Sequence, residues 1–206
     1  MSGHPISSSH TDDLSSFARD VLAVNISNSY RLLVVRGEGN DEAKKLLSSA
    51  TPKQILADLM GREDEARAVL AGLWLWHDWL DESHLISQSL HSSTGSFWHA
   101  IMHRREGDFS NSKYWYARCE EHPVIQQMAN QVGQILNTLP ADKAYLRLTA
   151  GGWNPNAFVD LIESVADDQR NPKYAVAVST PAMRSAVSMV DSSEPCARRP
   201  VLMSRK

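Results

Sequence analysis

The sequence predicts an all-α protein, built as an antiparallel helical bundle or as stacked helical hairpins. Apolar residues recur at helical spacing along most of the chain, and no apolar run alternates with period two for long. Capping residues, prolines and glycines divide this pattern into segments with the length of ordinary helices. Because the connections between these segments are short, successive helices are expected to pack against each other.

The first helices are expected in the N-terminal third of the chain. Thr11 is the expected cap of a helix over about 12–26, where apolar residues follow at helical spacing. Residues 30–35 are apolar, and a short strand and a buried helical turn both remain open for them. A short helix is expected over 41–47, and the Thr51-Pro52-Lys53-Gln54 signal starts another.

The apolar pattern is longest in the middle of the chain. Between 62 and about 90 only Gly72 interrupts it, which predicts one long helix or two nearly collinear helices. The later helices are expected over 97–106, 109–119, 123–139 and 155–166.

Three regions of different character follow from composition. Residues 1–10 are polar and rich in serine, which predicts a disordered N-terminus. Residues 11–170 are expected to form a single helical domain. Residues 171–206 contain four prolines and a basic end, and we expect this Ser/Pro-rich tail to pack poorly.

Charge and cysteine content exclude several classes of function. The 206 residues carry a formal net charge of -3 and no long basic run, which argues against nucleic acid as a partner. No apolar stretch is long enough for a membrane span, and the N-terminus lacks the apolar region of a signal peptide. Two cysteines, Cys119 and Cys196, are too few for a disulfide framework. A soluble, cytoplasmic protein that acts on a small-molecule substrate or ligand is expected, and its oligomeric state stays open.

Histidine and tryptophan are concentrated between residues 74 and 122. Six of the eight histidines and five of the six tryptophans lie in this block. Residues four and seven positions apart share one face of a helix. Two successive stripes have this spacing, and they consist of His77, Asp81 and His84, followed by His99, His103 and Glu106. If the two stripes face each other, imidazoles and carboxylates converge.

Imidazole with carboxylate suits iron, manganese or zinc, so a metal ion of this group is the expected cofactor. The candidate metal ligands are His77, Asp81, His84, His99 and His103. The candidate catalytic groups are Glu106, Asp81 and Tyr114, and the candidate substrate-binding residues are Trp98, Arg104, Arg105 and Trp115. The sequence His99-Ala100-Ile101-Met102-His103 lacks the glutamate of the HExxH zinc protease pattern.

The leading hypothesis is therefore a metal-dependent enzyme, an oxidoreductase or a hydrolase, that acts on a small molecule. It requires at least three of the six stripe residues to converge in one cavity that solvent can reach. The first alternative is a non-catalytic, TPR-like interaction protein, because residues 107–116 are similar to the turn and second helix of such a repeat. It requires a continuous exposed patch of Trp and Tyr side chains. The second alternative is a small-molecule binding protein with a Trp-rich pocket. The simplest explanation of the histidine cluster is that each histidine is a hydrogen-bonded structural residue in or beside the core.

Three stretches of the chain carry a resemblance. They read LDESHLISQ at 80–88, GSFWHAIMHRREGDFSNSKYW at 95–115 and WNPNAFVDL at 153–161. These stretches resemble a family of uncharacterised bacterial and fungal proteins, whose members carry LDxSHxISQ, GSFWHxIMHRREGDxxNxKYW and WDPxxFVDL. The resemblance implies no established reaction. Members of that family continue with a helix rich in Glu, Trp and Leu, where this chain has the tail from Asn171.

Overall fold

The computed structural model describes residues 14–119 and 122–179. Within these ranges the chain is helical, and the contact of Leu14 with Leu56 is an isolated antiparallel bridge. The all-α class is therefore confirmed. The helices are α1 (Ser16–Ala23), α2 (Asp41–Leu47), α3 (Pro52–Ile55), α4 (Glu63–Trp76), α5 (Leu80–Ser87), α6 (Ser93–Glu106), α7 (Phe109–Tyr116), α8 (Pro123–Leu136), α9 (Lys143–Thr149), α10 (Pro155–Val165) and α11 (Pro172–Ser179).

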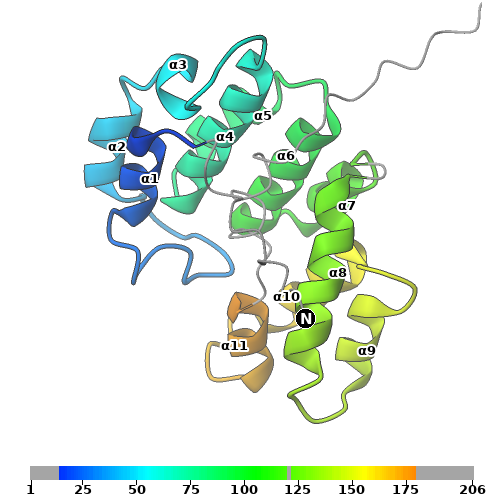
Figure 1. The fold of residues 1–206 in the computed structure, drawn as a ribbon. Helices are drawn as coiled ribbons and strands as arrows, with labels where there is room; N and C mark the ends of the chain where they lie inside the picture. Colours follow the sequence, from blue (N-terminus) through cyan, green and yellow to red (C-terminus); the bar gives the residue numbers. More distant parts are fainter. Residues whose placement is uncertain (1–13, 120–121, 180–206) are drawn as a thin grey trace, which may run out of the picture.

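The helices stack largely in chain order, as the hairpin version of the prediction requires. Helix α4 packs on α5, α5 on α6, and α6 on α7. Helix α10 then contacts α7, α9 and α11, while α8 packs on α9 (Figure 1). Short connections enforce this order, because they leave each helix next to its predecessor.

Polar side chains begin several of the helices. Ser15, Ser92, Asp108 and Asn154 each accept a hydrogen bond from a backbone N–H in the first turn of the following helix. Such caps satisfy donors that have no partner within the helix. Helix α1 therefore begins four residues later than expected, after Ser15, and the expected cap Thr11 lies outside the described residues.

Helix α4 is the centre of the core. All of its residues from Ala68 to Trp76 are buried, which explains why this stretch is apolar around its whole circumference. Trp98 of α6 is fully buried and packs against Gly72, where a Cβ atom on the glycine would lie 2.7 Å from the indole. The glycine that interrupts the apolar pattern thus serves close helix packing and does not end the helix.

The helix expected over 62–90 is broken at residues 77–79, so the prediction of one long helix or two collinear helices is wrong. Asp78 adopts the left-handed conformation with φ of 68°, and α5 turns back to lie against α4 (Figure 1). The Asp78 carboxylate lies 2.6 Å from the buried Arg105 guanidinium, and the Trp79 indole donates to the Asn40 carbonyl. Tertiary contacts therefore stabilise a turn that the local sequence does not signal.

Two further regions differ from the expectation. Residues 30–35 form neither the short strand nor the buried helical turn within the described structure. They pack as irregular chain, with Leu33 and Val34 buried. Helix α11 buries Tyr174 and Ala177, so the folded domain extends past the expected boundary at 170. The expected disordered segment 1–10 and the rest of the expected tail, 180–206, lie outside the described residues.

No helix in the described ranges has both the length and the apolar character needed to cross a membrane.

Candidate metal centre

Three imidazoles come together where α5 faces α6. His84 lies on α5, and His99 and His103 lie one turn apart on α6. The ring centroids are 4.7 Å apart for His84 and His99, 5.3 Å for His84 and His103, and 4.7 Å for His99 and His103. One nitrogen from each ring lies within 4.8 Å of one nitrogen from each of the others. The antiparallel packing expected for the two helices therefore brings half of the six stripe residues into one cluster.

His99 lies deepest in this cluster. Its side chain is buried, yet neither ring nitrogen has a hydrogen-bond partner among the described residues. The ring stacks on Trp115 of α7 with centroids 3.9 Å apart. Burial, together with His103 and His84, lowers the pKa of His99 to about 4. The imidazole is thus neutral at pH 7, and its unused lone pair is costly unless something binds it.

His103 has one nitrogen committed and one open. Its Nδ1 lies 2.6 Å from Glu106 Oε1, one turn later on α6. The Asn111 amide nitrogen lies 3.4 Å from Nδ1 and 3.0 Å from Nε2. A donor aligned with one ring nitrogen would lie much farther from the other, so the amide sits over the ring face. Glu106 therefore holds the proton on Nδ1, and the Nε2 lone pair in the ring plane stays open.

His84 completes the group from the other helix. It is half-buried, and its ring contacts within the described structure are those with His99 and His103. A second set of ligand-type atoms consists of His103, Glu106 and Asp108, again within 4.8 Å of one another. Asp108 is committed to capping α7, because it accepts from the Asn111 backbone N–H and the Ser110 hydroxyl. These bonds lower the pKa of Asp108.

The other two stripe residues on the α4–α5 side lie apart from the cluster. His77 is in the turn after α4, and its Nε2 hydrogen-bonds to the Val21 carbonyl at 2.9 Å. Asp81 is exposed on the first turn of α5 and belongs to neither group of ligand-type atoms in the described ranges. The break at Asp78 explains the position of His77, because it shifts the helical phase between 77 and 84.

The remaining candidates fall in three environments. Trp115 contacts the cluster directly through His99, whereas Tyr114 is exposed and its hydroxyl accepts from Arg118. Trp98 is fully buried in the core against Gly72.

The two arginines also lie in the core. Arg105 is fully buried and donates to the Leu75 and Leu32 carbonyls beside its ion pair with Asp78. Arg104 is buried, donates to the Tyr30 hydroxyl and lies over the Phe158 ring. Both guanidinium groups are thus held inside the domain.

Asn111 and Asp108 belong to the surroundings of the cluster but were not candidates. The sequence feature that could have pointed to them is Gly107. This glycine ends α6 and has φ of 92°. A left-handed glycine turns the chain back at once, so the first turn of α7 returns to the last turn of α6. Ser112 marks the same contact, since its hydroxyl donates to the Ala100 carbonyl at 2.8 Å.

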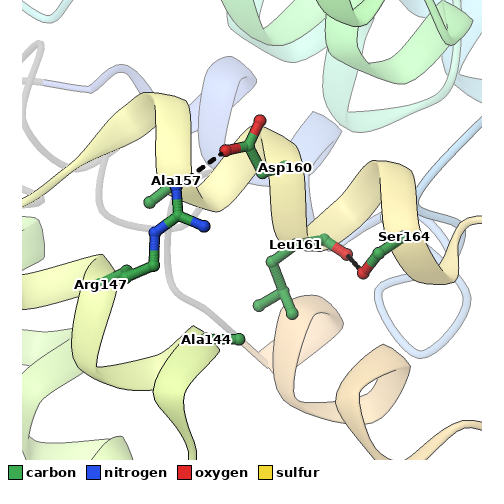
Figure 2. A pocket seen from close by; sticks show the side chains of 6 residues that line it. All are labelled: Ala144, Arg147, Ala157, Asp160, Leu161 and Ser164. Carbon is green, nitrogen blue, oxygen red and sulfur yellow. Dashed lines mark hydrogen bonds and ion pairs between the residues drawn. The ribbon is translucent and has the colours of Figure 1, made fainter.

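A separate pocket of about 210 Å³ lies between α9 and α10 (Figure 2). Its lining consists of Ala144, Arg147, Ala157, Asp160, Leu161 and Ser164, and none of the clustered histidines contributes to it. Arg147 and Asp160 pair with each other at 3.3 Å, as Figure 2 shows. Asp160 also pairs with Lys113 of α7 at 2.6 Å. The charged groups of this pocket are therefore already used to tie α7, α9 and α10 together.

No family model, curated protein or solved structure matches this chain.

Proposed function

We propose that the protein is a metal-dependent enzyme that acts on a small molecule at the cluster of His84, His99 and His103. The ion would be iron, manganese or zinc, and the reaction an oxidation or a hydrolysis. The observation that carries the proposal is His99, whose buried ring has two nitrogens without partners in the described ranges, beside two further imidazoles. A metal ion supplies a partner for such lone pairs, and three protein ligands leave a position for water or substrate.

The surroundings of the cluster support this proposal. Histidine ligands commonly donate their second ring N–H to a carboxylate, which fixes the tautomer and orients the ring. His103 and Glu106 have this arrangement, with 2.6 Å between Nδ1 and Oε1. His99 is oriented by its stack on Trp115. Two of the three ligand side chains therefore have neighbours that restrain their rings.

The burial of the tryptophans weighs against an aromatic interaction surface. Trp74, Trp76, Trp79, Trp98 and Trp153 are all buried, and Trp115 is half-buried against His99. An interaction groove built from aromatic residues requires them to be exposed together. The hypothesis of a metal-dependent enzyme thus has the stronger support.

Elemental analysis of protein purified without a histidine tag tests the proposal. We expect near-stoichiometric zinc, iron or manganese, either as purified or after reconstitution of the chelator-treated protein. His84→Ala and the double variant His99→Ala/His103→Ala should lose the metal. His91→Ala is the matched control, because His91 is an exposed histidine outside the cluster.

Circular dichroism of each variant separates loss of the site from loss of the fold, and His84→Ala removes only a half-buried ring. Absence of metal from the reconstituted parent protein would refute the proposal. Metal retained by folded His84→Ala and by the double variant would refute it equally.

A further inference from the structure

We propose that the cluster of His84, His99 and His103 is a four-coordinate zinc site with one position open to water, which makes the protein a hydrolase and not an oxidoreductase. This inference rests on the function proposed above and narrows it. Three observations support it. They are the kind of donor atoms that converge, the hydrogen bonds that already hold the nearby carboxylates, and the side of the cluster that is open.

The converging donors are all imidazole nitrogens. Within the described residues, the group that contains His84, His99 and His103 includes neither a carboxylate nor a thiolate. Non-haem iron that activates oxygen is held by two histidines and a carboxylate, and manganese prefers oxygen ligands. Three histidines with an open fourth position are instead a set that catalytic zinc uses.

The nearest carboxylates are committed to other partners. Glu106 accepts from His103 Nδ1 at 2.6 Å, so it supports a ligand residue and does not itself bind the ion. Asp108 accepts from the Asn111 backbone N–H at 3.0 Å and the Ser110 hydroxyl at 2.9 Å. Recruiting either group to the ion would break a charge-assisted hydrogen bond or uncap α7. The neutral donor set is therefore favoured.

The spacing suits a small tetrahedral ion after a slight contraction. Zinc–nitrogen bonds of about 2.0–2.1 Å place the ligand nitrogens roughly 3.3 Å apart. The three nitrogens already lie within 4.8 Å of one another. His99 and His103 are within 18° of parallel, so their rings must tilt toward each other to share an ion.

The open position lies on the side of His84 and Glu106, which are more exposed than the other residues of the cluster. His99 and His103 are buried, whereas His84 is half-buried and the Glu106 side chain is 39 % exposed. Three neutral ligands leave the full double charge on the ion, and this lowers the pKa of a bound water to about 7. Hydrolysis follows without change of oxidation state. The water oxygen bonds to the electrophilic carbon of the substrate, and the leaving group departs with a proton.

Cobalt(II) substitution tests this inference without a known substrate. We expect the cobalt-loaded protein to show the intense visible absorption of four-coordinate cobalt, and the bands to shift when azide is added. His91→Ala should give the same spectra, and His84→Ala should abolish them. A weak, octahedral spectrum would overturn the four-coordinate site. An intense spectrum that azide leaves unchanged would overturn the open position.

The variant His84→Asp adds a second check. It replaces one imidazole donor with a carboxylate on the same helix, and we expect the visible bands of the cobalt-loaded protein to shift, because catalytic zinc sites accept two histidines and a carboxylate but the ligand field changes with the donor. An unchanged spectrum would show that His84 is not a ligand and would overturn the site. If zinc fails to bind while iron or manganese binds, the zinc inference is overturned and the proposed function stands, whereas the proposed function itself fails only if zinc, iron and manganese all fail to bind the parent protein.

Discussion

Glu106 illustrates how a single exposed carboxylate can matter to a buried cluster. Its Oε1 lies 2.6 Å from His103 Nδ1, which leaves Nε2 as the ring nitrogen available to an ion. A carboxylate in this position raises the basicity of the imidazole and holds one tautomer. We therefore expect Glu106 to contribute to the affinity of the proposed metal site and not to the stability of the fold.

We expect Glu106→Gln to weaken zinc binding by roughly 10- to 100-fold, the usual effect of removing such a partner. Competition with a chromophoric chelator measures the affinity. The matched control is Asp81→Asn, because Asp81 is exposed and outside the cluster. An equal loss in both variants would mean that general surface charge, and not the contact with His103, sets the affinity.

At the residue scale, the helical spacing of histidines predicted part of the cluster. His99 and His103 are on one face of α6, and His84 reaches them from α5. His77 could not be separated from them by spacing alone, because the break at Asp78 depends on Arg105, which comes much later in the chain. The commitment of Glu106 to His103 also requires rotamers that a sequence does not give.

Helix α4 and helix α6 approach closely at Gly72, and this contact makes an element-scale prediction. Gly72→Ala places a methyl group 2.7 Å from the buried Trp98 indole, which has little room to move. We expect a loss of about 1–3 kcal/mol in the free energy of unfolding, as for other overpacked cores. Urea denaturation measures this loss.

Gly133→Ala is the matched control within a helix. A Cβ at Gly133 of α8 meets nothing within 4 Å in the described structure, so only the backbone preference changes. We expect this variant to gain up to about 1 kcal/mol, because alanine favours the helix over glycine. Stabilisation by both variants would contradict the close packing of α4 on α6.

The turn between α4 and α5 depends on a buried ion pair. Arg105 is fully buried, and Asp78 is its carboxylate partner at 2.6 Å. We expect Asp78→Asn to destabilise the protein by about 3–5 kcal/mol, since it leaves a buried guanidinium charge unpaired. Asp167→Asn, which removes an exposed pair with Arg36, should change the unfolding midpoint little. Equal effects would show that the turn does not rely on Arg105.

At the scale of the whole molecule, the order of the helices was more predictable than their ends. Short connections and continuous apolar periodicity imply stacked hairpins, and α4 to α7 follow this order. Helix α9 has only seven residues, which is too short a window for a periodic signal, so sequence reasoning missed it. Helix α11 was hidden by the prolines around it, although its Tyr174 hydroxyl reaches back to accept from the Leu33 backbone N–H.

His122 joins the start of α8 to the start of α6, and we expect it to make the stability of the whole molecule depend on pH. Its Nδ1 accepts from the Val124 backbone N–H at 3.1 Å, so the proton is on Nε2, which donates to the Thr94 hydroxyl at 2.9 Å. Burial lowers the pKa of His122 to about 4. Burial also lowers the pKa of His77. In the unfolded chain both groups have a pKa near 6.5.

As the pH falls, the unfolded chain therefore binds protons at His77 and His122 that the folded protein does not bind. The contribution of His122 to stability is complete above about pH 6.5 and is lost as the pH falls toward 4, at most about 3 kcal/mol. Urea denaturation of the metal-free protein across this range should show the decline. His122→Asn keeps a capping acceptor but does not titrate, so its decline should be smaller, whereas that of His91→Asn should match the parent protein. A decline of the same size in His122→Asn would assign the acid sensitivity to other groups.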